Sequence, residues 1–254
     1  MTGFLFLINF AGRNIRCVMI GKAEIRRSLG SFSLWDMFII VGFVVTSLTV
    51  SIVTGQFAAW SFIGGVFSIL CVIYGAKGHM LNFVFGFIGS IILGIIMFKS
   101  GIYAMAAFYI LYNVPMQFAG WNQWRKRRHS PSAKVVRTRW MNWSQRILMV
   151  CVTAVLILGF QAILQRFTDD AQPLNDAAAV SVAIVTQFVL VFAFIEQWFL
   201  WITMDIVMGV VWIVSWKSGV PHAAIQFVLE MFYLINAVRG VFIWKKLQKE
   251  DGSN

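Results

Sequence analysis

The chain has 254 residues, of which 59% are hydrophobic and only 12% are charged. Soluble domains carry about 25% charged residues, so this composition excludes an ordinary soluble globular protein and indicates several passes through a membrane. The net charge of +11 does not require nucleic acid as a partner, because basic residues that collect beside membrane segments account for it.

Eight apolar stretches have the length that crosses a bilayer. They lack the alternation of a membrane β-barrel, and backbone groups in lipid must be bonded within their own segment, so each stretch is predicted to be a helix. The predicted fold class is an all-α polytopic membrane protein with eight transmembrane helices. The stretches lie at residues 36–54, 58–76, 80–98, 101–122, 146–164, 177–195, 198–216 and 221–243.

Basic residues gather in three places that share one side of the membrane if there are eight spans. These are the N-terminal segment 1–34, the loop 125–145 and the tail 245–254, whereas the loop near 165–176 carries three aspartates against Arg166. Short cytoplasmic loops collect Lys and Arg, so both termini are predicted to be cytoplasmic. The same basic residues are expected to contact the anionic headgroups of membrane lipids.

Two short sequence patterns recur in the same order, separated by almost 120 residues. The recurrence predicts two copies of a three-helix unit, at 58–124 and 177–244. The paired segments are Lys99-Ser100-Gly101 with Lys217-Ser218-Gly219, and Gly120 and Trp124 with Gly240 and Trp244.

The segment between the two units decides how they are oriented. Residues 146–176 supply one linking helix and an outer loop, so both three-helix units run in the same direction. With an extra helix at 35–57, the predicted arrangement is 1+3+1+3 with parallel repeats. Transporters with such repeats bind substrate between the halves near the bilayer midplane. The plan favours a transporter over a receptor or an anchor.

Polar residues inside apolar spans are costly, so each needs a reason. In the seventh span Trp198, Trp201 and Asp205 share one helix face. Two indoles beside a carboxylate suit a flat ring that carries a polar or cationic group. For Trp198, which is near the end of the span, a place in an interfacial aromatic belt is the alternative.

Other predicted spans also carry polar residues on one face. In the fourth span Asn113 and Gln117 lie one turn apart, with Pro115 between them to interrupt the backbone hydrogen bonds. Such side chains can also serve only to bond neighbouring helices. Their concentration in corresponding spans of the two units favours a pocket. The predicted substrate-binding residues are Asn82, Asn113, Gln117, Trp198, Trp201, Asp205, Tyr233 and Asn236.

The sequence carries no sign of catalysis or of a bound metal. No HExxH, GxSxG or paired Cys/His motif occurs in the spans, and the three cysteines and three histidines are scattered. The chain is therefore predicted not to be an enzyme and to need no cofactor. A membrane scaffold, whose polar faces make only helix contacts, is the remaining alternative to a transporter.

Four segments resemble the PnuC family of bacterial vitamin transporters, whose usual member carries nicotinamide riboside. The resemblance runs from residue 58 to 246, and the family shares its 3+1+3 plan with the sugar-transporting SWEET proteins. One extra helix precedes that plan in this chain. The four segments are Asn82-Phe83-Val84-Phe85-Gly86, Lys99-Ser100-Gly101-Ile102-Tyr103, Gly120-Trp121-Asn122-Gln123-Trp124 and Glu196-Gln197-Trp198-Phe199-Leu200-Trp201-Ile202.

The resemblance implies facilitated diffusion of nicotinamide riboside across the bacterial inner membrane, with accumulation through phosphorylation by a cytoplasmic nicotinamide riboside kinase. It also implies a homo-oligomer, since members of the family resemble trimers. Trp198 or Trp201 would stack on the cationic pyridinium ring, and Asn82, Gln117 and Asp205 fall where the family carries polar residues on pore-facing helices.

This chain departs from the family at Gln197, where an Asn is usual, and related members carry thiamine or riboflavin. Transport of one of those vitamins is therefore an alternative. Another is proton-coupled uptake, in which Asp205 or Glu230 would carry the proton.

Overall fold

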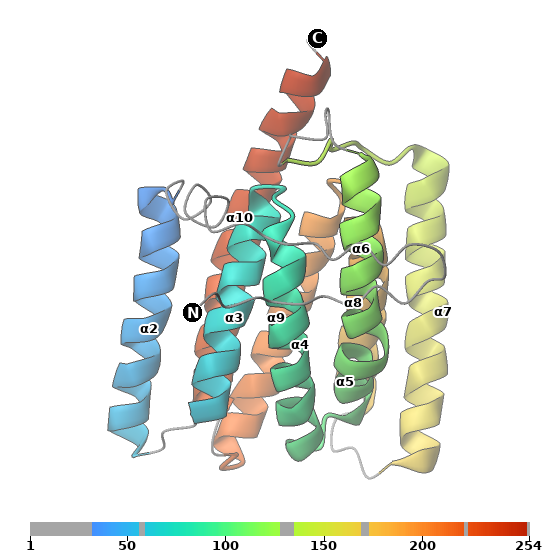
Figure 1. Ribbon diagram of the computed structural model, residues 1–254. Helices are drawn as coiled ribbons and strands as arrows, with labels where there is room; N and C mark the ends of the chain where they lie inside the picture. Colours follow the sequence, from blue (N-terminus) through green and yellow to red (C-terminus); the bar gives the residue numbers. More distant parts are fainter. Residues whose placement is uncertain (1–31, 56–58, 128–134, 169–172, 221–222, 253–254) are drawn as a thin grey trace, which may run out of the picture. The chain divides into compact units, whose positions relative to one another are not determined.

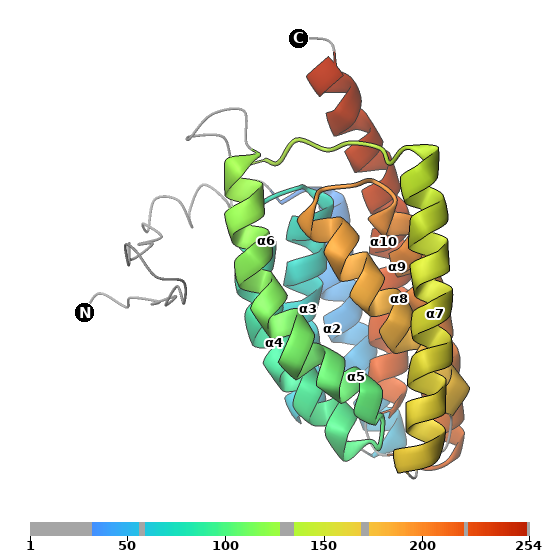
Figure 2. The same cartoon turned by 90° about the vertical axis from the view of Figure 1, so that its right-hand side faces the viewer.

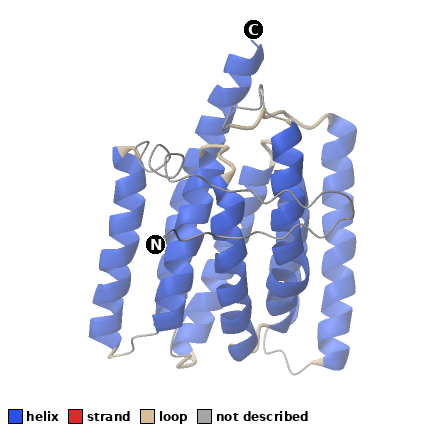
Figure 3. Cartoon of the chain, in the orientation of Figure 1, coloured by secondary structure: helices blue, strands red, loops and turns tan. Residues whose placement is uncertain are grey.

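The computed structural model describes residues 32–55, 59–127, 135–168, 173–220 and 223–252. Its regular structure is helical (Figure 3). The chain divides into two compact units, residues 1–38 and 39–254. In the first unit, Ser33 and Asp36 exchange hydrogen bonds of 2.6 and 3.3 Å at the start of helix α2. The predicted N-terminal segment 1–34 lies almost wholly outside the described residues.

Seven helices within the described ranges are long and apolar enough to cross a bilayer, which confirms an all-helical polytopic membrane protein. In Figure 1, α3, α8 and α10 run in one direction, and α4, α7 and α9 run in the other. The seven helices are α2 (Leu34–Thr54), α3 (Ala59–Ala76), α4 (Leu81–Lys99), α7 (Trp143–Phe167), α8 (Pro173–Val191), α9 (Gln197–Lys217) and α10 (Ala223–Gly252).

The predicted fourth span, 101–122, is not a single α-helix. It consists of three consecutive pieces, α5 (Tyr103–Ala107), the π-helical η1 (Phe108–Asn113) and α6 (Val114–Lys126). Pro115 has no N–H, and in an α-helix its ring would collide with the carbonyl four residues earlier. The wider turns of η1 just before Pro115 avoid that collision, so the interruption predicted at the proline takes the form of a π-helix.

The ends of two helices follow from local capping and propensity. At the start of α7, Asn142 Oδ1 accepts from Gln145 N at 2.9 Å and Gln145 Oε1 accepts from Asn142 N at 3.0 Å, a reciprocal capping box. Near the C-terminus, α10 continues to Gly252, so most of the segment 245–254, which was predicted to be a cytoplasmic tail, is helical. Lys, Gln and Glu dominate that segment, and all three favour helix.

The turn between α3 and α4 has the same hydrogen bonds as the turn between α8 and α9. Gly78 N donates to Gly75 O, and Ala193 N donates to Leu190 O, both at 2.9 Å. The donors have positive φ angles of 63° and 56°. A left-handed conformation costs about 1–2 kcal/mol for a residue such as Ala193, so the surrounding contacts must hold it there.

The turn after α4 also matches the turn after α9. Gly101 N donates to Phe98 O at 3.2 Å, and Gly219 N donates to Trp216 O at 3.0 Å. Both glycines are left-handed, with φ of 76° and 82°. The recurring Lys-Ser-Gly triplets therefore form the same helix-ending turn in both places, where glycine provides the positive φ.

Residues 135–141, which we name the strap, link the α3–α4 turn to the α8–α9 turn. Val136 N donates to Gly78 O at 3.1 Å, Arg139 N donates to Ala193 O at 3.1 Å, and Ile195 N donates to Arg139 O at 2.9 Å. In Figure 2 the strap runs along one end of the helices to the start of α7. It therefore joins two turns that lie far apart in the sequence.

Glu196 anchors the end of the strap. Its carboxylate accepts from the Met141 backbone N–H at 3.0 Å and from Arg146 Nε at 3.0 Å, and the Arg146–Glu196 ion pair measures 2.9 Å. Only 7% of the Glu196 side chain is exposed. Its charge is thus satisfied by groups from the strap and from the first turn of α7.

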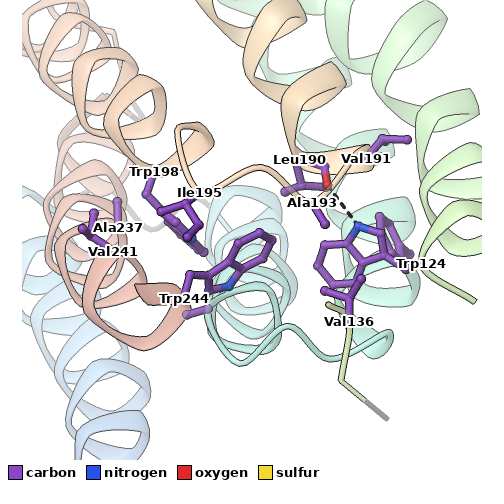
Figure 4. Packing of buried hydrophobic residues seen from close by; sticks show 12 residues of the cluster. Trp124, Val136, Leu190, Val191, Ala193, Ile195, Trp198, Ala237, Val241 and Trp244 are labelled. Carbon is purple, nitrogen blue, oxygen red and sulfur yellow. Dashed lines mark hydrogen bonds between the residues drawn. The ribbon is translucent and has the colours of Figure 1, made fainter. Parts of the chain in front are cut away.

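A cluster of three tryptophans lies beneath the strap (Figure 4). Trp124 Nε1 donates to Leu190 O and Trp244 Nε1 donates to Gly75 O, each at 3.0 Å. The Trp198 ring meets the Trp244 ring edge-on at a centroid distance of 5.8 Å. Every indole of the cluster is buried.

Two helices lie outside this packing. In α7 only Leu164 is buried, and the exposed residues of its central part, 147–163, are apolar, as expected of a helix that faces lipid. In the second unit, α2 packs through Phe43, whose ring meets that of Phe232 at 6.2 Å and covers Gly65.

We expect Glu196→Ala to lower the melting temperature of the detergent-solubilised protein by about 4–8 °C. The change removes hydrogen bonds to a charged group worth about 1.5–3 kcal/mol and leaves the partly buried Arg146 unpaired. Glu196→Gln keeps an acceptor and should lose less than half as much. Equal melting temperatures for the alanine variant and the native protein would show that Glu196 does not anchor the strap.

Gly240→Ala should also destabilise the fold. A Cβ at position 240 would lie 2.5 Å from the Trp198 indole, and overpacking of this kind costs about 1–3 kcal/mol. Gly159→Ala is the matched control, because a Cβ there meets nothing within 4 Å and alanine is the better helix former. Thermal unfolding should separate the two variants by several degrees, and identical curves would contradict the described packing of Trp198 on Gly240.

Candidate substrate site

A cavity of about 100 Å³ lies within the second unit. One water molecule needs about 10–15 Å³ measured in this way, so the cavity has room for several waters or part of an organic molecule. Its walls come from α3, α4, η1, α6, α8, α9 and α10. Among the described helices, α2 and α7 contribute no lining residue. The cavity is therefore lined by two sets of helices, which we name the first helix group (α3, α4, α5, η1 and α6) and the second helix group (α8, α9 and α10).

All eight residues predicted to bind substrate lie on the wall of this one cavity. Their place there does not by itself show what they bind. The alternative of an interfacial belt is excluded for Trp198, because only 3% of it is exposed and it packs against Gly240 and Trp244. The eight are Asn82, Asn113, Gln117, Trp198, Trp201, Asp205, Tyr233 and Asn236.

One wall carries a chain of polar side chains that bond one another. Gln117 Nε2 donates to Asn113 Oδ1 at 2.8 Å, and Asn113 Nδ2 donates to Ser90 Oγ at 2.9 Å. Ser90 Oγ in turn donates to Gly86 O at 2.5 Å. These bonds connect α6, η1 and α4, so the two amides also bond neighbouring helices, which was the alternative to a role in substrate binding. The bond to Asn113 fixes the orientation of Gln117 at the cavity.

The opposite wall joins α10 to α3. Asn236 Nδ2 donates to Val72 O at 2.8 Å, and Tyr233 of α10 and Ser68 of α3 both line the cavity. The amide of Asn236 is completely buried. The Asn236 bond therefore joins α10 to α3 at the cavity wall.

Four lining residues have a buried polar atom without a hydrogen-bond partner in the described part of the chain. Three of these atoms are acceptors, Asn82 Oδ1, Asp205 Oδ2 and Asn236 Oδ1, and one is a donor, Trp198 Nε1. An unmet buried polar group costs about 1–3 kcal/mol, so such atoms are rare unless a water or a ligand bonds them. A bound molecule with several hydrogen-bond donors would satisfy the three acceptors.

Aromatic rings supply the apolar surface of the cavity. One face of Trp198 packs on Gly240 and its edge on Trp244, so its position is fixed. Trp201 also lines the cavity and is only half-buried, which leaves it the freer ring for stacking. Tyr109 adds a ring from η1, so that stacking partners stand on both helix groups.

Sequence reasoning missed several lining residues. Ser90 follows Gly86 by one turn and Asn82 by two, so the helix face of Asn82 pointed to it. Tyr109 lies one turn before Asn113 on η1, and Gln187 is an amide in an apolar stretch. Serine and tyrosine are common in transmembrane helices, so neither gave a distinct signal, whereas Gln187 could have been singled out.

The site has an acidic side chain and no basic one among the described lining residues. Asp205 is a buried carboxylate on the cavity wall, and no Lys, Arg or His is among the lining residues that the structure describes. Glu230 is also buried; it does not line the cavity, precedes the lining residue Tyr233 by one helical turn and lies near enough to Asp205 to interact with it electrostatically. The site therefore suits a neutral or cationic molecule.

Residues 58–246 match the family described as nicotinamide mononucleotide transporter. A relative from Neisseria mucosa, named nicotinamide riboside transporter PnuC, is 28% identical over 192 residues, which are 74% of this chain and 72% of the relative. A protein of the same name from Escherichia coli is 24% identical over 218 residues, covering 75% of this chain and 87% of that protein.

A solved structure extends the likeness to the fold. The crystal structure of the vitamin B3 transporter PnuC is similar with a TM-score of 0.79 and 26% identity, covering 91% of this chain and 99% of the solved chain. The chain therefore belongs to the PnuC nicotinamide riboside transporter family, and it is a membrane transporter and not an enzyme.

Proposed function

We propose that this protein carries nicotinamide riboside into the cell by facilitated diffusion. The observation that supports this most is the cavity between the two helix groups, which combines aromatic walls, the Asp205 carboxylate and unpartnered acceptors. The relatives named nicotinamide riboside transporters support the same substrate.

The chemistry of nicotinamide riboside matches these groups. Its pyridinium ring is flat and cationic, which favours stacking on Trp201 or Trp198 with Asp205 as the counter-charge. Its ribose hydroxyls and its carboxamide N–H groups are donors for Asn82, Asn236 and Asp205. We propose that Asn113, Gln117 and Tyr233 complete the contacts.

The nucleoside fits this site better than the mononucleotide in the family description. A phosphate monoester adds a charge of about −1.5 to −2 at neutral pH. None of the described lining residues is basic, and Asp205 is itself acidic. A dianion would thus enter an apolar site without a counter-charge, at a cost that these walls do not offset.

We propose eight spans in a SWEET-like 1+3+1+3 plan with parallel repeats at 58–124 and 177–244. The extra helix is at 35–57, and 146–176 forms the linking helix and outer loop. The matching turns support this plan, as do the parallel directions of α3 with α8 and of α4 with α9 (Figure 1). Rocking of one repeat against the other would give alternating access.

We propose that both termini are cytoplasmic and that the membrane is the bacterial inner membrane. The strap and the basic segment 245–249 lie at the same end of the helices, as the positive-inside rule requires of cytoplasmic loops (Figure 1). A cytoplasmic nicotinamide riboside kinase would then trap the substrate. A homotrimer is proposed on the family resemblance.

One structural observation favours a second mechanism. Glu230 is buried close to Asp205, and paired carboxylates inside a membrane often carry protons. Proton-coupled uptake is therefore the alternative to facilitated diffusion. Thiamine or riboflavin is the alternative to the substrate.

Titration of the intrinsic tryptophan fluorescence tests the substrate. We expect saturable quenching by nicotinamide riboside, because Trp198 and Trp201 line the cavity, and at least a tenfold weaker response to thiamine, riboflavin and nicotinamide mononucleotide. Proteoliposomes should then equilibrate nicotinamide riboside with or without a pH gradient. Uphill uptake driven by the gradient would replace facilitation by proton coupling, and a response to another vitamin alone would overturn the substrate.

Asp205→Asn tests the role of the carboxylate with a matched pair of ligands. The variant should bind nicotinamide riboside about tenfold more weakly, because the attraction between the carboxylate and the cationic ring is lost. Binding of the reduced, uncharged dihydro form of the same nucleoside should change less than threefold. Equal losses for both ligands would mean that Asp205 recognises a hydroxyl or supports the fold, and does not recognise the cationic ring.

A further inference from the structure

Toward the strap, the cavity is closed by a layer of two buried tryptophans and one strap residue. On this side the cavity ends at Trp124 and Trp244, which are completely buried, and at Val136 of the strap, which packs with them. Toward the other end, α4 and α9 continue past the cavity through further buried residues such as Met97 and Trp212.

Two hydrogen bonds, each from a tryptophan of one helix group to a backbone carbonyl of the other, hold the layer of Trp124, Trp244 and Val136 together. Trp124, at the end of α6, bonds the carbonyl of Leu190 in α8, and Trp244, on α10, bonds the carbonyl of Gly75 in α3. Each bond thus joins the third helix of one group to the first helix of the other (Figure 4 shows the Trp124 bond). Gly75 and Leu190 also line the cavity, so both bonds lie at its boundary.

The strap covers the same layer with bonds to both groups. Its Val136 and Arg139 N–H groups donate to the carbonyls of Gly78 and Ala193, the left-handed residues of the two matching turns. Thr138 Oγ1 donates to Trp244 O at 3.2 Å. The two helix groups cannot separate at this end while these bonds and both indole bonds are intact.

We propose that Trp124, Trp244 and the strap form the gate at the strap end of the cavity, and that substrate passes this end only when both indole–carbonyl bonds break. The proposal rests on the proposed transport function. Trp124 and Trp244 then control the opening of this end, and the residues that line the cavity bind the substrate.

Cys71 reports whether the gate is open, because it lines the cavity. Cys17→Ser and Cys151→Ser leave it as the single thiol of the chain. In proteoliposomes, a membrane-impermeant methanethiosulfonate reagent is added on the strap side. The double variant W124F/W244F keeps both rings apolar and removes both N–H donors. It should speed Cys71 labelling about fivefold for each bond lost. Trp216→Phe, on the half-exposed far end of α9, is the control and should leave the rate unchanged.

Binding of nicotinamide riboside, measured by calorimetry on the same variants, separates the two proposals. Saturable binding by the double variant together with faster labelling supports the gate. Unchanged labelling and unchanged uptake in the double variant overturn it, whatever the native protein binds. Absence of binding and uptake in the native protein overturns the proposed function instead, and the labelling comparison still decides whether the barrier opens at the tryptophans.

A gentler variant covers the case in which the double variant does not fold. Thr138→Val removes only the hydroxyl bond to Trp244 O and keeps the side-chain volume. Deuterium exchange at the Val136, Arg139 and Ile195 amides should be several-fold faster in this variant. Exchange as slow as in the native protein, with Cys71 labelling also unchanged, would show that the strap does not hold the gate.

Discussion

The structure depends on one constraint, that a backbone polar group in hydrocarbon must be bonded within the protein. Helices meet this constraint along their length, and the places where they end or change need other partners. The matching turns bond their own carbonyls, and the carbonyls of Gly75 and Leu190 each accept a further bond from an indole. Tryptophan N–H groups thus join the two helix groups at the last turns of α3 and α8, where the regular helix bonds end.

The cavity follows from the same constraint. Polar side chains are tolerated on its walls because they bond one another, as Gln117, Asn113 and Ser90 do, or because they face a space that water or a ligand can occupy. Four lining residues, Asn82, Trp198, Asp205 and Asn236, each keep one buried polar atom without a partner in the described part of the chain. Bonds between helices and polar atoms without a partner thus occur on neighbouring residues of the same helices.

Hydropathy predicted most of the helices because length and apolarity alone identify a span. It could not place the end of α8, which was predicted at residue 195 and lies at Val191. The turn that follows is made of apolar residues, and its reversal depends on Ala193 in a left-handed conformation that composition does not reveal. Helix periodicity placed Trp198, Trp201 and Asp205 on one face, but Tyr109 and Ser90 join them only through tertiary packing.

The two helix groups resemble each other in their turns but not in their third helices. Residues 103–126 contain a π-helical segment followed by Pro115, whereas α10 is an unbroken α-helix of 30 residues. A helix without a full set of regular backbone bonds bends more easily than a continuous one. The two helix groups are therefore unequal, one compliant and one stiff, and we expect bending to concentrate in the group that carries the proline.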